Sequence, residues 1–381
     1  MPVAGQLVQA LGGGPVHVVA LRAAGSFGLL LSLAYVSFGR GRSPLEMLFW
    51  PELLSRTLMV AIGLLGGLTG LASPATLFAV VLFAAHASAG LPVSYVSTLY
   101  GLVYPDEHRA RIVAVTRMVN GMVGIAAAFF IGRLLQGRPE DYLLVYPLYG
   151  AFAILVSLHY RKMPTPKARQ AESPDAPSAW QVLKTDRAFR GFQFFQFLLG
   201  LANLAAIPVI DVHVRKGLGL PIGLAVVVVN QGVIGMSATL LTVRYQARLF
   251  DRLGVLRHRV LTSLFLGAAL LVWAFTDSLA GAAFAALLTG LGMAGGQIIW
   301  LIGSLSFAPK EQLSTYMGIH TFLTGLRGVA APYLGLWLME QPFLAWDQRK
   351  FFIGAATLVF LSAWGHAWVA RSSPPSSTTT S

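Results

Sequence analysis

The stretch ARLFDRLGVLRHRVL, residues 247–261, lies between two long apolar segments. It holds four arginines and one aspartate, in a chain of 381 residues of which only 11% are charged. The chain is 55% hydrophobic and has a mean hydropathy of +0.66, whereas an average soluble domain carries about 25% charged residues. Charges gathered into short loops between apolar runs indicate an integral membrane protein.

Apolar segments near the roughly 20-residue length of a bilayer-spanning helix recur along the whole chain. We expect helices, because unpaired backbone amides in hydrocarbon cost several kcal/mol each and the alternation typical of a membrane barrel is missing. The expected fold class is therefore all-α and polytopic, with about eleven transmembrane helices. The predicted spans are residues 17–38, 56–73, 76–103, 111–133, 142–160, 189–214, 221–243, 259–276, 280–307, 313–338 and 351–370.

Most of the 28 lysines and arginines fall in alternate loops, beginning with the loop that holds Arg40 and ending with Arg371. Positively charged loops face the cytoplasm. The sequence therefore predicts a cytoplasmic C-terminus, an outside N-terminus and a location in the cell inner membrane.

Residues 161–188, RKMPTPKARQAESPDAPSAWQVLKTDRA, are rich in proline and in charge. This composition predicts a cytoplasmic linker. It separates a first bundle of five helices, residues 1–160, from a second bundle of six, residues 189–370. Residues 371–381 are expected to form a disordered tail.

The two halves resemble each other at a displacement of about 205 residues. YPDEHRARIVAVTRMVNGMVGIAAAFF, from Tyr104, aligns without a gap with APKEQLSTYMGIHTFLTGLRGVAAPYL, from Ala308, and pairs Gly121 with Gly325. Nearer the N-terminus the alignment pairs the first span with the second span of the later half. We therefore expect a plan of six plus six helices that lacks the first helix, either because the start codon was assigned too far downstream or because the chain is naturally short.

The opening stretch resembles the loop signature of the major facilitator superfamily, G-x-L-x-D-R-x-G-R-[RK]. Asp251, Arg252 and Gly254 match its core, and Arg257 and Arg259 match its basic end. The resemblance extends to the span pattern, the linker and the repeat, and implies two pseudo-symmetric bundles whose loop motif clamps neighbouring helices and releases them when the transporter rocks. Anchoring by positive charge alone is the other interpretation of this stretch.

Three features depart from the family's patterns. Ala247 replaces the opening glycine of the motif, and the first-half loop FGRGRSPLEMLFWPELLSR, residues 38–56, has no D-R-x-G. The segment GMVGIAAAFFIG also lacks the proline of the drug-antiporter signature, so multidrug export is not indicated.

Polar residues follow one side of the span 189–214 at helical spacing. These residues are Gln193, Gln196, Gly200, Asn203 and Asp211. Polar groups are costly when they face lipid, so this side should face protein or water. Lining of a central cavity and hydrogen bonding between helices both remain open.

The resemblance implies that spans 76–103 and 280–307 also line the cavity. In the second of these, LTGLGMAGGQIIW, the glycines favour close helix packing, whereas Gln297 and Trp300 are candidate ligand contacts. In the first, His86 is either a structural histidine or a proton carrier.

Arg327, in TGLRGVAAP, lies nearest the middle of a span. A guanidinium at that depth needs a partner, which could be backbone carbonyls, Asp211 or an anionic substrate. Transport of an organic anion is therefore one hypothesis. Uniport, or coupling to a proton or another ion through His86 or Asp211, stays open.

Several functional classes are not indicated. The chain has no cysteine, which excludes disulfides and thiolate chemistry. It has no H-E-x-x-H, G-x-S-x-G or phosphate-binding glycine loop in a suitable context, so we expect no enzyme, no cofactor and no metal site. The net charge of +13 is spread over short loops, which argues against a nucleic-acid partner.

We therefore expect a monomeric secondary transporter for a small solute, embedded in the lipid bilayer. The alternative is a membrane scaffold or sensor that does not transport, which the altered first-half loop favours.

Overall fold

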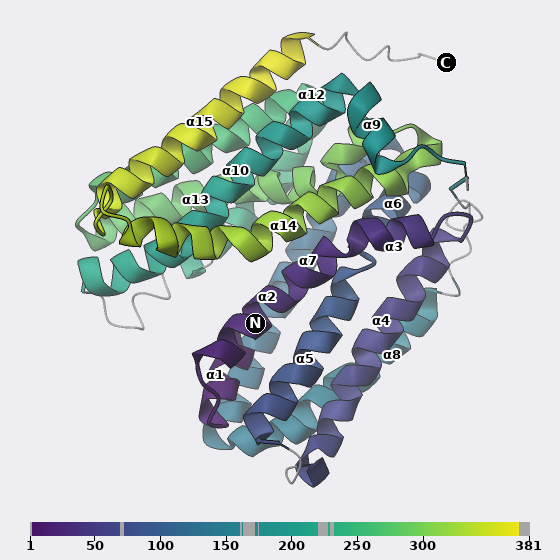
Figure 1. Ribbon diagram of the computed structural model, residues 1–381, viewed down its shortest axis with the longest axis vertical. Coiled ribbons are helices and arrows are strands. Elements are labelled where there is room, and N and C mark those ends of the chain that lie inside the picture. Colours follow the sequence, from purple (N-terminus) through teal and green to yellow (C-terminus); the bar gives the residue numbers. More distant parts are fainter. Residues whose placement is uncertain are drawn as a thin grey trace. The chain divides into compact units, whose positions relative to one another are not determined.

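The computed structural model describes residues 2–68, 72–160, 162, 172–173, 175–219, 228 and 232–372. Every regular element in this part of the chain is helical, which confirms the all-α fold class. The elements of the first part of the chain are α1 (Pro2–Ala10), α2 (Pro15–Leu30), α3 (Ser32–Phe38), α4 (Pro44–Ala61), η1 (Ile62–Leu68), α5 (Pro74–Gly90), α6 (Val93–Val103), α7 (Asp106–Gly137), η2 (Pro139–Asp141) and α8 (Tyr142–Tyr160). Those of the second part are α9 (Ala179–Thr185), α10 (Arg187–Val212), η4 (His213–Gly217), α12 (Val233–Phe275), α13 (Leu279–Ile302), η5 (Gly303–Ser306), η6 (Lys310–Gln312), α14 (Leu313–Glu340) and α15 (Gln348–Ser372) (Figure 1).

Eight helical segments in the described part of the chain are long and apolar enough to cross a membrane. They are Pro44–Gly67, Pro74–Val103, Asp106–Leu135, Tyr142–Tyr160, Arg187–Arg215, Val233–Phe275, Leu279–Ser306 and Gln348–Ser372, and Ala23–Phe38 is a shorter apolar helix. These segments are consistent with a polytopic membrane protein. The count of eleven spans stays a prediction.

The helix predicted for residues 56–73 begins earlier than hydropathy indicated. Pro44 is the first residue of α4, and the fixed φ of proline suits the first turn of a helix. Only residues 39–43, which we call the α3–α4 turn, remain of the predicted loop 38–56. Of the charges of this stretch, Arg40 and Arg42 lie in the turn and the others lie on the helix. There Arg56 forms an ion pair of 2.6 Å with Glu52 one turn before it.

The loop predicted around residues 247–261 is shorter than expected, because two helices, which together carry the label α12 (Val233–Phe275), meet within it at Gly254. Only Gly254 leaves the helical conformation, with φ 72° and ψ 168°. Left-handed φ values are accessible to glycine at little cost, so a single residue supplies the bend. The early part of the predicted span 221–243 lies outside the described residues.

Contacts within the chain form two compact units. Unit 1 contains Met1–Pro105, Val119–Ala179 and Ala308–Val329, and unit 2 contains Asp106–Met118, Trp180–Phe307 and Ala330–Ser381. Two helices, α7 and α14, therefore have one part in each unit. The division into bundles 1–160 and 189–370 with a linker between them stays a prediction.

Unit 1 is built on the packing of α2 against α5 and of α4 against α5 and α8. Phe78 and Leu82 on α5 are fully buried, and the Phe78 ring meets the edges of Tyr142 and Tyr146 on α8. Where lipid replaces water outside the protein, such close van der Waals packing is a main source of association between helices.

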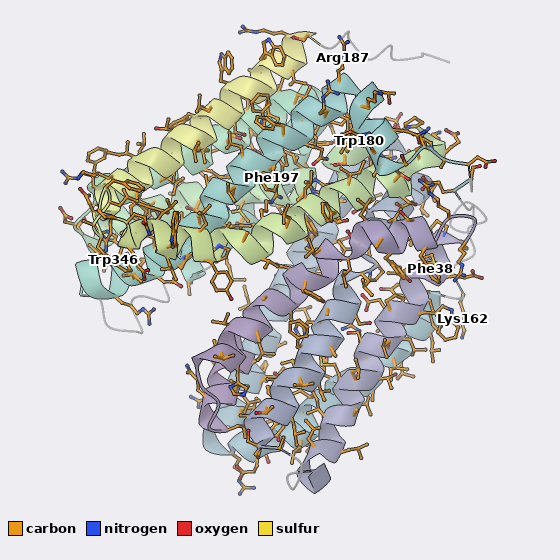
Figure 2. All side chains as sticks on the ribbon, viewed as in Figure 1. Phe38, Lys162, Trp180, Arg187, Phe197 and Trp346 are labelled. Carbon is orange, nitrogen blue, oxygen red and sulfur yellow. The ribbon has the colours of Figure 1, made fainter. Side chains whose placement is uncertain are left out.

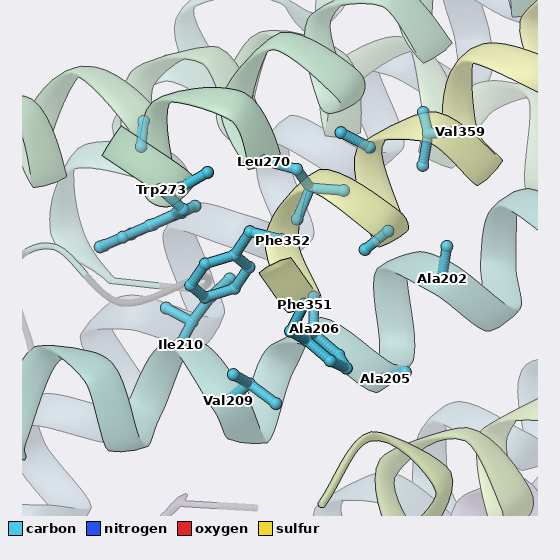
Figure 3. Packing of buried hydrophobic residues seen from close by; sticks show 14 of the residues in the cluster. Ala202, Ala205, Ala206, Val209, Ile210, Leu270, Trp273, Phe351, Phe352 and Val359 are labelled. Atoms are coloured by element: carbon cyan, nitrogen blue, oxygen red, sulfur yellow. The ribbon is translucent and has the colours of Figure 1, made fainter. Parts of the chain in front are cut away.

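Unit 2 is built on α12, which packs against α13 and α15, and on α10, which packs against α15. Trp273 and Phe352 are 1% and 0% exposed and meet Val209 and Ile210 in the cluster shown in Figure 3. Two tryptophans of this unit are exposed. Trp180 lies on α9, and Trp346 lies in the turn between α14 and α15 (Figure 2).

Candidate functional site

A polar cluster lies inside unit 2, among apolar helices. We call it the Arg259 cluster, and its members are Gln193, Gln196, Gln246, His258, Arg259, Ser304 and His366. None of these residues is more than 4% exposed. Because burying a polar group is costly unless it is hydrogen-bonded, such a cluster is retained only where its members satisfy one another.

Hydrogen bonds tie the cluster across three elements. Nε of Arg259 on α12 donates to Oε1 of Gln196 on α10 over 2.7 Å. Nε2 of Gln193 donates to Oγ of Ser304, in η5, over 2.9 Å. The polar side of α10 thus faces protein at these two positions. This arrangement is the hydrogen bonding between helices that the sequence left open, and a role of these glutamines in a solute pathway stays a prediction.

Two histidines of the cluster are held in defined tautomers. Nε2 of Gln246 donates to the Leu291 carbonyl, which turns its Oε1 toward Nε2 of His258, 2.8 Å away. Nε2 of His258 is therefore the protonated nitrogen. In His366 it is Nδ1, which donates to the Ser362 carbonyl over 2.8 Å. Within the described residues the second nitrogen of each ring is buried without a hydrogen-bond partner.

Glycines on α13 make room for this cluster. A Cβ atom at Gly295 would lie 2.8 Å from Cε1 of His258, and one at Gly296 would lie 3.4 Å from Nη1 of Arg259. At Gly290 a Cβ atom would lie 2.4 Å from the backbone oxygen of Gly235. The glycines that the sequence assigned to close packing therefore bring α13 against α12 and also admit buried polar side chains.

The other candidates on α10 and α13 lie outside the Arg259 cluster. Asn203 and Asp211 are half-buried on α10, and the Asp211 carbonyl accepts a hydrogen bond from Nε of Arg215. Gln297 and Trp300 are half-buried on α13. The guanidinium of Arg117 on α7 lies 5.9 Å from the centre of the Trp300 ring, within the range of a cation–π interaction.

The remaining two candidates belong to unit 1. Nδ1 of His86 meets the Leu82 carbonyl one turn earlier, at 3.1 Å. Arg327 on α14 is 5% exposed, and its Nη2 donates to Oγ1 of Thr324 over 3.0 Å. Gly325 lies against the backbone of Leu30 on α2, so the first part of α14 packs closely on that helix. His86 and Arg327 are thus grouped separately from the candidates in unit 2.

The motif that opened the sequence forms a second site in unit 2. Oδ2 of Asp251 accepts from Nε of Arg111, near the start of α7, at 3.2 Å. Arg252 and Arg257 are exposed, as expected for a loop motif, whereas Arg259 is buried. The expectation that Arg259 belongs to a basic loop end was wrong, because it lies more than one turn beyond the Gly254 bend, where α12 is already inside the unit.

Sequence reasoning missed three buried polar residues, Gln246, His258 and His366, and the half-buried Glu172. His366 could have been noticed, because it stands alone in the apolar run SAWGHAW. Glu172 could not, because its partner, Thr315, is 143 residues away. Within the described residues no group of three or more His, Cys, Asp or Glu is placed to hold a metal ion.

Comparisons with known proteins agree with this architecture. The family model described as Major Facilitator Superfamily matches residues 22–332. A search of curated protein sequences gives no match.

Several solved transporters share the fold. The E. coli fucose:proton symporter FucP is 15% identical with a TM-score of 0.72, over 96% of this chain and 93% of that one. The human organic anion transporter MFSD10 is 16% identical with a TM-score of 0.68, over 95% and 88%. A bacterial homologue of the iron transporter ferroportin, in an outward-facing state with soaked iron, is 14% identical with a TM-score of 0.73, over 97% and 94%. At these identities the similarity shows the fold alone.

Proposed function

Because the chain belongs to the Major Facilitator Superfamily, we propose that it is a secondary transporter that moves a small solute across the membrane by alternating access. The observation that carries the proposal is the ion pair between Asp251 and Arg111 beside the Gly254 bend. The Arg111 side chain is 59% exposed and the Asp251 side chain 15%. An ion pair with one partner in water contributes little, on the order of 1 kcal/mol. Such a pair can form and break in every transport cycle.

We propose an organic anion as the solute. Arg327 supports this class, because a buried guanidinium within an apolar helix is expensive and is usually kept for function. The fold is compatible with it, since the human organic anion transporter MFSD10 has the same fold, although the fucose symporter has it too. We also propose that transport is coupled to a proton or another ion through His86 or Asp211. The transporter is proposed to act as a monomer.

The test is solute uptake into proteoliposomes that contain the purified full chain. A panel of organic anions and neutral sugars should show uptake of an anion. Arg327→Gln should reduce that uptake at least tenfold, Arg327→Lys should retain part of it, and Arg371→Gln, at the exposed end of α15, should match the unaltered protein. Uptake of no solute in the panel would instead favour the scaffold or sensor, and full uptake by Arg327→Gln would remove Arg327 from the solute pathway.

We further propose an inner-membrane location with the N-terminus outside and the C-terminus in the cytoplasm, as the distribution of basic residues predicts. The chain contains no cysteine, so single cysteines can be labelled without background. An impermeant maleimide added to intact cells should label Gln9→Cys and spare Ser372→Cys. The reverse pattern would invert the topology.

A further inference from the structure

One stretch of the predicted linker, around Glu172, is attached to helices of unit 1. The Glu172 carbonyl accepts from the backbone N–H of Gly41 over 3.0 Å, and the Pro177 carbonyl accepts from Nη2 of Arg40 over 2.9 Å. Both donors belong to the α3–α4 turn. The linker is therefore fixed at this point to the turn that replaces the first-half loop.

The side chain of Glu172 reaches the start of α14. Its Oε1 accepts from Oγ1 of Thr315 over 2.6 Å, and the carboxyl group also accepts hydrogen bonds from the Ser314 hydroxyl and the Thr315 backbone N–H. The first backbone N–H groups of a helix have no partner within the helix, and an acceptor there satisfies them. Glu172 thus caps α14 while its own backbone is held by the α3–α4 turn. We call Glu172, Ser314, Thr315 and Gly41 the linker latch.

The second half has a counterpart of this arrangement. There Asp251, beside the Gly254 bend, contacts Arg111 near the start of α7. The internal repeat aligns Tyr104 with Ala308, and in that register position 111 coincides with position 315. The partners of the two acids, Arg111 and Thr315, therefore occupy equivalent places in the two halves.

The two acids differ in where they come from. Asp251 belongs to the motif of its own half, whereas the first-half loop has no D-R-x-G. The acid closest to the matching place in that loop, Glu46, is exposed in the first turn of α4. The acid that contacts the start of α14 comes instead from the linker.

We propose that Glu172 replaces the acid missing from the first-half loop, so that the linker latch holds the start of α14 in one conformation of the transporter and releases it in another. This inference rests on the proposed transport function in one respect only, namely that the two conformations are those of a transport cycle. The latch itself is a positioning device, and Glu172 need not contact the solute.

The burial of the Glu172 carboxyl group is consistent with a group that exchanges between the closed latch and water. Desolvation raises the pKa of Glu172 above its ordinary value of 4.5, against the hydrogen bonds from Thr315 and Ser314 and the charge of Arg40. Among the described residues, Arg40 on the α3–α4 turn and Tyr95 on α6 are charged or titratable neighbours that interact with it electrostatically. Release into water would return the carboxyl group to its ordinary range.

The test reads the latch without measuring transport. Ser97 on α6 is fully buried, and its neighbour Thr98 donates to Ser314, so Ser97→Cys reports opening beside the start of α14. In the full chain at pH 7, Glu172→Ala should raise the rate of maleimide labelling of Ser97→Cys about tenfold, which corresponds to about 1.4 kcal/mol. Glu172→Gln keeps an acceptor oxygen and should label no faster than the unaltered latch. Glu46→Gln and Asp175→Asn are the matched controls and should change nothing.

Labelling of Glu172→Ala at the unaltered rate would overturn the proposal. If Glu172→Ala does not give folded protein, Thr315→Val removes the donor to Oε1 instead, with Thr315→Ser as its control. Faster labelling of Ser97→Cys in Thr315→Val would then support the proposal, and an unaltered rate would overturn it. Absence of solute uptake together with faster labelling would reject transport and keep the latch. Uptake together with unchanged labelling would reject the latch and keep transport.

Discussion

Nε of Arg259 lies 2.7 Å from Oε1 of Gln196, so a guanidinium that is 4% exposed is joined directly to a neighbouring helix. The bond links α12, five residues beyond the Gly254 bend, to α10, the helix that follows the linker. Its two residues are 63 positions apart, and both are surrounded by apolar packing. Replacing Gln196 would therefore remove a hydrogen-bond acceptor from a buried charged group.

We predict that Gln196→Leu lowers the free energy of unfolding by about 1–3 kcal/mol, because it removes an acceptor from a buried charged donor. Gln196→Glu should retain most of the stability, since a carboxylate can accept the same hydrogen bond. The measurement is the thermal unfolding of the detergent-solubilised protein, with Gln181→Leu on the exposed face of α9 as the control. Equal stability of Gln196→Leu and the control would show that the bond contributes little.

The bend at Gly254 predicts a glycine-specific requirement. Gly254→Ala should cost about 1–2 kcal/mol of stability, because an L-residue is strained at a φ of 72°. Gly254→Asn should cost about as much, since a ψ of 168° places this residue outside the left-handed helical region that asparagine tolerates and in a region that is essentially limited to glycine. The matched control is Gly354→Ala on α15, where an added Cβ meets nothing within 4 Å and where alanine should stabilise the helix by up to about 1 kcal/mol. Similar unfolding temperatures for both alanine variants would contradict the strain argument.

The ion pair between Asp251 and Arg111 predicts a coupling that depends on salt. In a double-mutant cycle with Asp251→Asn and Arg111→Gln, the two changes should couple by about 0.5–1 kcal/mol at low ionic strength. The coupling should shrink in about 1 M salt, where the Debye length is about 3 Å. It can be measured as thermal stability and as the maximal rate of uptake. Additive effects at low salt would mean that the pair does not act as a unit.

The raised pKa of Glu172 predicts a pH dependence with a definite sign. A carboxyl group whose pKa is higher in the folded protein than in the unfolded chain binds the extra proton in the folded state, so its contribution to stability is fullest below 4.5 and is lost as the pH rises through the raised pKa. The stability of the unaltered protein relative to Glu172→Gln should therefore fall as the pH rises above 4.5. A difference that grows with pH, measured by unfolding scans of both proteins, would reverse the sign and remove burial as the dominant cause.

The sequence predicted the elements whose signal is local. The polar side of α10 follows the helical period, so the protein-facing positions of Gln193 and Gln196 could be expected from residue spacing alone. The motif also drew attention to Asp251 and Gly254, which lie in an ion pair and at a bend of α12. The sequence predicted the ends of the helices less accurately, because hydropathy alone does not reveal that Pro44 begins α4 inside a charged stretch.

The sequence did not predict features that depend on distant contacts. Arg259 was assigned to a loop because it belongs to a run of arginines, and its burial depends on the space that Gly295 and Gly296 leave on α13. Glu172 lies in a segment whose composition indicates a linker without fixed contacts, and its hydrogen bonds with Thr315 and Gly41 reveal a fixed position. No periodic pattern or motif in the sequence indicates the burial of Arg259 or the fixed position of Glu172.

The two helices that have one part in each unit, α7 and α14, differ in how easily they can bend. A continuous helix advances by a fixed rise of about 1.5 Å per residue, so neither segment can stretch, and any displacement has to be absorbed as curvature. In α14 the boundary falls between Val329 and Ala330, and Pro332 just beyond it has no N–H to donate to the Gly328 carbonyl. In α7 the boundary falls between Met118 and Val119, where no proline interrupts the ladder. We therefore expect α14 to bend more easily near Pro332 than α7 does near Met118.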